Sequence, residues 1–221
     1  MDYKKFLNYL GQLRIYSFLD ILVFATALSW KVDTIIGIGF IWLSFLLYLE
    51  GQHKDKPRLP VSENLWLAPF VVSLILLPPF ICILFALFSF LYTKKNHGKL
   101  WGISAPLWRG LQNGVLALAF SPEIAVLAFI LTLARNLIGD FRDAEDDKKR
   151  SITTIPVAIG LKNNQSWAFY AHMILVVATT IIWFHYSFLA LYLIWPIIVI
   201  EILSYPLTPR LSNPKYLNIY N

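Results

Sequence analysis

Three aspartates stand out in the stretch RNLIGDFRDAEDDKKRSITTIPVAIG, residues 135–160. Asp140, Asp143 and Asp147 are spaced three and four residues apart, so on a continued helix they share one face, with Asn136 one turn earlier. The carboxylates of such a row repel one another, and near a helix C-terminus the negative end of the helix dipole repels them as well. A bound Mg²⁺ would offset this repulsion, because Mg²⁺ is commonly held by one or two carboxylates together with substrate phosphates. The spacing therefore indicates a candidate magnesium and phosphate site.

A simpler interpretation of the same stretch is a solvated loop. Lys148, Lys149 and Arg150 follow the aspartates directly, so opposite charges could compensate one another in water. Spacing alone leaves both interpretations open, because short motifs often match by chance.

The chain that must position these groups is strongly apolar. It is 57% hydrophobic and only 14% charged, with a mean hydropathy of +0.60, whereas roughly a quarter of a soluble domain is charged. This composition indicates an integral membrane protein. The net charge of +6 is divided among short polar stretches, which argues against nucleic acid and favours lipid headgroups or a phosphorylated substrate. The single cysteine, Cys82, excludes an intramolecular disulfide.

Hydropathy predicts an all-α protein. The apolar segments lie near residues 15–30, 33–49, 65–93, 103–120, 123–141, 165–184 and 187–205. The segment at 65–93 is either one helix of about 43 Å, which is long for a hydrocarbon core of about 30 Å, or two helices of about 21 Å divided at Pro78-Pro79.

The distribution of basic residues favours two helices divided at Pro78-Pro79. With this division, both termini and the 50–64, 94–101 and 142–163 loops lie on one side, and the opposite turns contain only Lys31. We therefore expect a multi-pass transmembrane bundle of about eight helices, forming a single domain over residues 1–221. Both termini and the aspartates would face the cytoplasm, in a plasma or organelle membrane. The N-terminal stretch superficially resembles a signal peptide, but Asp20 within it favours an uncleaved first helix.

In its surroundings, the aspartate stretch resembles the second aspartate-rich motif of the UbiA-type intramembrane prenyltransferase superfamily. That motif has the form D-x-x-D-x-x-x-D, followed by basic residues, Thr, Pro and Gly. The matching residues, in order over about 25 positions, are Asp140, Asp143, Asp147, Lys148, Lys149, Arg150, Thr154, Pro156 and Gly160. Weaker similarities are Leu13-Arg14-Ile15 and the segment KPRLP at 56–60.

The family's first motif, N-D-x-x-D-x-x-x-D, is not matched in this chain. The corresponding stretch, IWLSFLLYLE at 41–50, offers at best Glu50 in place of one acid, with His53 and Asp55 nearby. The chain is also shorter than typical members, which have nine helices. The fold therefore transfers from the resemblance more safely than the full activity.

The resemblance implies a central cavity, open toward the cytoplasmic side, in which Mg²⁺ binds the diphosphate of an isoprenyl donor. It assigns metal and catalytic roles to Asp140, Asp143 and Asp147. Substrate-binding roles fall on Asn136, Arg14, Lys148, Arg150 and Glu50. Lys94, Lys95 and Arg109 are further candidate diphosphate contacts, although any of these basic residues could instead set topology. Gln112 and Asn113 are candidates for cavity residues or for interhelical hydrogen bonds.

Three functions remain open at this point. The first is transfer of an isoprenyl group to a lipophilic, commonly aromatic acceptor. The second is a catalytically degenerate protein that binds an isoprenoid or a partner protein, as the missing first motif suggests. The third is a diphosphate cyclase or hydrolase. We expect the prenyltransferase, and we do not expect a transporter because no paired broken helices are evident.

Overall fold

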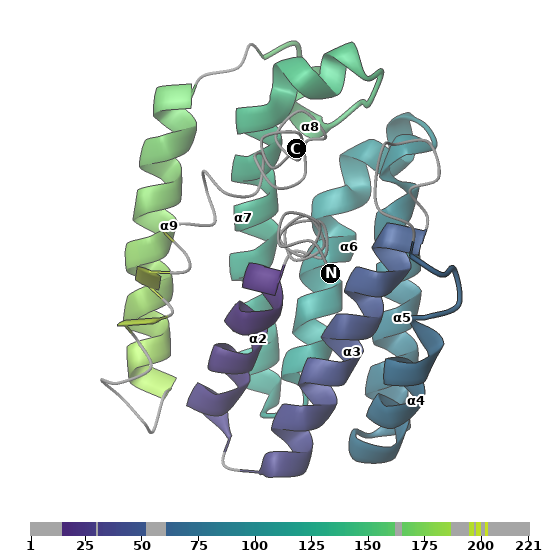
Figure 1. Ribbon diagram of the computed structural model, residues 1–221. Coiled ribbons are helices and arrows are strands. Elements are labelled where there is room, and N and C mark those ends of the chain that lie inside the picture. Colours follow the sequence, from purple (N-terminus) through teal and green to yellow (C-terminus); the bar gives the residue numbers. More distant parts are fainter. Residues whose placement is uncertain are drawn as a thin grey trace, which may run out of the picture. The chain divides into compact units, whose positions relative to one another are not determined.

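A computed structural model describes residues 15–29, 31–51, 61–161 and 165–186, together with residues 195, 196, 198, 199 and 202. Every regular element in these ranges is a helix (Figure 1). The helices are α2 (Ile15–Leu28), α3 (Val32–Gly51), α4 (Leu67–Leu76), α5 (Pro79–Thr93), η1 (Lys94–Asn96), α6 (Lys99–Ala117), α7 (Pro122–Lys149), α8 (Ile155–Ala158) and α9 (Gln165–Tyr186). The all-α class and the number of about eight helices are confirmed, although α8 is a single turn and the predicted helix at 187–205 lies mostly outside the described residues.

The predicted division of the 65–93 segment is confirmed. Leu77 takes an extended conformation, with φ −116° and ψ 156°, and α5 begins at Pro79. A residue before proline is pushed out of the helical region, and proline itself is well suited to the first position of a new helix. With 10 residues, α4 is only about 15 Å long, which is shorter than predicted.

Three helices of the described ranges are long and apolar enough to cross a membrane: α3, α7 and α9. This agrees with the predicted membrane association, whereas the eight-pass topology and the cytoplasmic termini stay predictions. Helix α7 has 28 residues, or about 42 Å, which exceeds a hydrocarbon core of about 30 Å. Its polar end, which carries the three aspartates, therefore extends past the apolar part.

The expectation that the cytoplasmic loop begins at residue 142 was wrong, because α7 continues to Lys149. Residues 142–149 contain no Gly or Pro and include Ala, Glu, Lys and Arg, which favour helix. Ser151, at φ 60°, then ends the helix. Its N–H donates to the Lys148 carbonyl at 3.1 Å, and that of Ile152 donates to the Asp147 carbonyl at 2.9 Å, which is a Schellman motif. All three aspartates therefore lie on one continuous helix.

The part of the chain that the structure describes divides into two compact units. The first holds its residues up to 77 and from 183 onward, and the second holds its residues between 78 and 182. In the first unit α3 packs against α2 and α4. Ile38, Ile41 and Phe45 are buried on α3. The Ser44 hydroxyl donates to the Trp66 carbonyl at 2.9 Å, which fixes the start of α4 against α3.

In the second unit α6 packs against both α5 and α7 (Figure 1). A Cβ atom added at Gly110 would lie 3.0 Å from the Phe129 carbonyl oxygen, and one added at Gly114 would lie 3.2 Å from that of Ala125. Small residues one turn apart let two helix backbones approach closely, as is common between transmembrane helices. The backbone of α7 is therefore held close to α6 along this part of its length.

Gly102 is a third point of close approach, between α6 and the segment that follows α7. A Cβ atom there would overlap the Thr153 carbonyl oxygen, which is backbone and cannot rotate away. Gly102→Ala is expected to lower the melting temperature in detergent, at a cost of about 1–3 kcal/mol. Gly139→Ala is the control, because the nearest atom to its Cβ is an Arg142 nitrogen at 4.0 Å, and Ala is favoured over Gly within a helix by roughly 0.5–1 kcal/mol. Equal melting temperatures for the two variants would contradict the prediction.

Candidate functional site

The centre of the site is an ion pair between η1 and the polar end of α7. The Lys95 ammonium donates to Asp140 Oδ1 at 2.9 Å and to Asp147 Oδ2 at 3.3 Å. Both aspartates are more than nine-tenths buried, at 7% and 6% exposure. The short helix η1 directly follows α5 and thereby places Lys95 opposite α7. One ammonium group thus bridges two carboxylates that are two helical turns apart.

The charges of this group do not cancel. Burial favours the neutral amine of Lys95, but the carboxylates of Asp140 and Asp147 outweigh burial and raise the pKa of Lys95 above its ordinary value, with a smaller contribution from Tyr92. Lys95 is therefore an ammonium at neutral pH. One positive charge faces two carboxylates, so this group keeps one net negative charge.

Two buried oxygen atoms, one of them in the ion pair, lack hydrogen-bond partners. Within the described part of the chain, Asp140 Oδ2 and Thr154 Oγ1 are buried without a hydrogen bond. Leaving such a group unpaired costs about 1–3 kcal/mol. Thr153, the neighbour of Thr154, lies against Gly102, and a Cβ atom at Gly102 would also be 3.5 Å from the Lys95 carbonyl oxygen. The segment that carries Thr154 therefore runs beside η1, and both unpaired oxygens suit a bound ligand.

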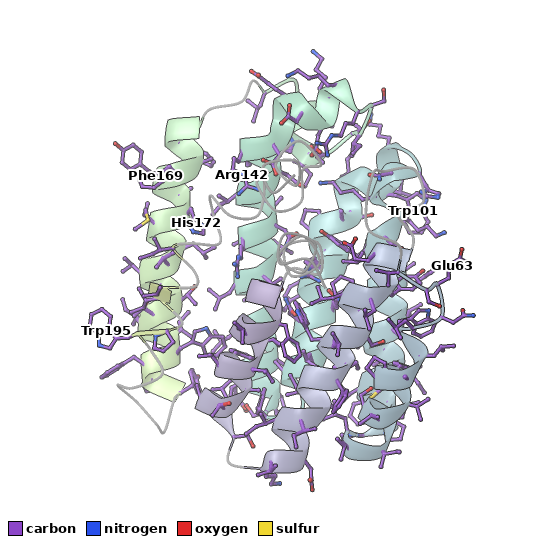
Figure 2. All side chains as sticks on the ribbon, in the orientation of Figure 1. Glu63, Trp101, Arg142, Phe169, His172 and Trp195 are labelled. Carbon is purple, nitrogen blue, oxygen red and sulfur yellow. The ribbon has the colours of Figure 1, made fainter. Side chains whose placement is uncertain are left out.

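The third predicted ligand is held differently. Arg142 donates to both carboxylate oxygens of Asp143, at 2.7 and 2.8 Å. The Asp143 side chain is 39% exposed, whereas Arg142 is buried near the polar end of α7 (Figure 2). Across the described residues, no three acidic, His or Cys groups are arranged to hold a metal ion. Asp140 and Asp147 are therefore the two buried carboxylates at the polar end of α7, and Asp143 lies apart from them in its pair with Arg142.

Three of the remaining predicted substrate residues, Asn136, Lys148 and Arg150, lie on α7 or directly at its end. Asn136 donates to the carbonyl of Thr132 in its own helix at 3.0 Å. Lys148 and Arg150 are exposed at the end of α7. Glu50 is buried at the end of α3, in the other unit. Arg14 and the 56–60 segment lie outside the described residues.

A second polar group lies between α5 and α6. The Gln112 side chain is fully buried; its amide nitrogen donates to Ser89 Oγ at 2.5 Å, and its carbonyl oxygen accepts from Arg109. The Arg109 guanidinium carbon lies 5.3 Å from the ring centroid of Tyr92, the same tyrosine that influences Lys95. The structure thus gives Gln112 an interhelical role, and it places Arg109 over the ring of Tyr92 at the end of α5.

Sequence reasoning did not single out Lys95 from the other basic residues, and it missed Ser89 and Tyr92. Lys95 is 45 residues from Asp140 and 52 from Asp147, so no local spacing links the three. The sequence around a basic residue at the polar end of an apolar helix is the same whether that residue contacts lipid headgroups or a buried carboxylate.

Comparison with known proteins gives a partial similarity. Over 82 residues the chain is 32% identical to the digeranylgeranylglyceryl phosphate synthase of Methanosphaera stadtmanae. These 82 residues are 37% of this chain and cover 30% of the synthase. The matched region thus spans less than a third of the synthase. No family model matches the chain, and no solved structure does.

Proposed function

We propose that this chain is an intramembrane prenyltransferase, which moves an isoprenyl group from a polyprenyl diphosphate to a lipophilic or aromatic acceptor with the help of Mg²⁺. The observation that carries the proposal is the buried pair Asp140 and Asp147, with an unpaired oxygen, at the polar end of a helix long enough to cross a membrane. The partial similarity to a synthase whose name specifies geranylgeranyl groups on glyceryl phosphate supports it.

The reaction breaks the bond between C1 of the allylic group and the diphosphate oxygen, and the electron pair leaves with the diphosphate. The acceptor then forms a bond to C1 and gives up a proton. Bound Mg²⁺ would supply charge neutralisation for the leaving diphosphate. In this proposal Asp140 and Asp147 would hold the ion, and Lys95 and Arg109 would donate to phosphate oxygens as negative charge develops there.

The membrane environment completes the proposed site. The isoprenyl chain would lie in a central cavity among the apolar helices, where exclusion of water protects the allylic cation from hydrolysis. The polar end of α7 would face the cytoplasm, since the basic loops favour that side. Isoprenyl diphosphates could then enter from the aqueous phase while the acceptor enters from the bilayer.

One observation favours a second candidate function. Lys95 already lies between the two carboxylates, and Asp143 is already paired with Arg142. A protein that only binds an isoprenoid, without turning it over, would need no metal at this position. The unmatched first motif is consistent with this alternative.

Calorimetry on the detergent-purified chain, with a geranylgeranyl diphosphate analogue that cannot ionise, tests the proposal. Binding is expected to require Mg²⁺, and absence of binding with and without Mg²⁺ would overturn the proposed function. Product analysis with geranylgeranyl diphosphate then separates the alternatives. A prenylated acceptor supports the transferase, a free alcohol or a cyclic product supports a hydrolase or cyclase, and binding without turnover supports the binding protein.

A further inference from the structure

The ion pair between Lys95 and the two buried aspartates suggests how metal and substrate binding are linked. We propose that Lys95 acts as an internal cation, which occupies the acid pair in the ligand-free protein and moves to the diphosphate when substrate binds. Metal binding at Asp140 and Asp147 would then be weak alone and stronger when the diphosphate is bound. This inference rests on the proposed function and gives Lys95 a second role, in addition to its contact with the diphosphate.

The geometry supports occupancy of a cation position by Lys95. Its ammonium nitrogen contacts one oxygen of each aspartate, at 2.9 and 3.3 Å. A divalent ion bound by the same two oxygens would have to share that place with the ammonium. An ammonium and a divalent ion that contact the same two carboxylate oxygens would repel one another strongly. The acid pair therefore binds one of the two cations more readily than it binds both together.

A diphosphate changes this balance of charge. Lys95 and the two aspartates together carry one net negative charge, so a divalent ion alone would leave the group net positive. The oxygens of a diphosphate bring several further negative charges and strong acceptors for an ammonium group. With the diphosphate present, the Lys95 ammonium can therefore bind phosphate oxygens while Asp140 and Asp147 bind the divalent ion.

The surroundings of Lys95 permit such a movement. Its side chain is 24% exposed, whereas those of its two aspartate partners are 9% exposed. The four-carbon stem of lysine is flexible, and its ammonium can exchange partners without movement of the backbone. The unpaired Asp140 Oδ2 gives an incoming ion a first contact while Lys95 still holds Oδ1.

Binding of Mn²⁺, followed by electron paramagnetic resonance of the free ion, tests this inference without turnover. The unaltered protein is expected to bind Mn²⁺ weakly alone and roughly tenfold or more tightly with the non-ionisable geranylgeranyl diphosphate analogue. Lys95→Met is expected to bind Mn²⁺ alone roughly tenfold or more tightly than the unaltered protein, and the analogue roughly tenfold more weakly. Lys95→Gln keeps a hydrogen-bond donor without the charge, and it serves if Lys95→Met does not fold.

The matched control is Lys149→Met. Lys149 also pairs with an aspartate, Asp146, at 3.4 Å, but its side chain is 73% exposed, so its loss is expected to leave both affinities unchanged. Mn²⁺ affinity in the Lys95 variants that equals or falls below that of the unaltered protein would overturn the inference. Failure of the unaltered protein to bind the analogue would instead overturn the proposed function, so the two failures are distinguishable.

Discussion

Asp140→Asn is expected to lower Mg²⁺-dependent release of pyrophosphate from geranylgeranyl diphosphate by roughly 10²-fold to 10³-fold, which is the usual effect of losing one preorganised charge-stabilising group. Asp140 contributes one oxygen to Lys95 and has a second, unpaired oxygen in the same buried site. Asparagine retains the size of the side chain but not its charge. A continuous assay of pyrophosphate measures the effect.

Two other aspartates on the same helix serve as comparisons for Asp140→Asn. Asp146 pairs only loosely with Lys149 and its side chain is 61% exposed, so Asp146→Asn is expected to keep the activity of the unaltered protein. Asp143 is bound by Arg142 and is 39% exposed, so Asp143→Asn is expected to have a smaller effect than Asp140→Asn. Activity of Asp140→Asn within threefold of that of Asp146→Asn would refute the assigned role of the acid pair.

Gln112→Leu is expected to cause the largest loss of stability, at about 3 kcal/mol. The leucine removes a fully buried amide that joins Arg109 on α6 to Ser89 on α5. Arg109 then loses an acceptor inside an apolar bundle, and Ser89 loses a donor. Thermal unfolding in detergent, followed by circular dichroism, measures the loss.

A double variant shows whether the loss of stability comes from the Arg109 guanidinium that has lost its Gln112 acceptor. Removal of both partners of a polar pair is less harmful than removal of one, so Gln112→Leu combined with Arg109→Leu, which also removes the half-buried charge, is expected to recover part of the stability. Thr93→Val is the control on α5, because the Thr93 hydroxyl bonds only the Phe90 carbonyl of its own helix and is exposed; its effect is expected within about 0.5 kcal/mol. Simple addition of the two single losses would contradict this explanation.

Local properties of the sequence were sufficient to place most of the described helices, although not all of their ends. Long apolar runs predicted the helices, and Pro78-Pro79 predicted the break between α4 and α5, because proline geometry acts on immediate neighbours. The end of α7 was misplaced because hydropathy falls at residue 141, whereas helix propensity continues to Lys149. Hydropathy detects where a helix leaves an apolar environment, which is not where its hydrogen bonds end.

The helical period also explains which aspartates meet. At about 100° per residue, Asp147 is rotated by only about 20° from Asp140, whereas Asp143 is rotated by about 60°. The sequence therefore determined a stripe of three acids, and the structure turned two of them inward and left the third to Arg142.

What only the tertiary structure decided is the identity of the cation between those two acids. Lys95 reaches them because α5 ends where it does and η1 turns its side chain toward α7. The same packing brings Gln112 on α6 to Ser89 on α5, 23 residues earlier in the chain. Such partners are tens of residues apart, and their pairing depends on which helices lie side by side. Periodicity and composition act along the chain, so they specify which residues share a helix face, whereas packing between helices specifies what each face meets.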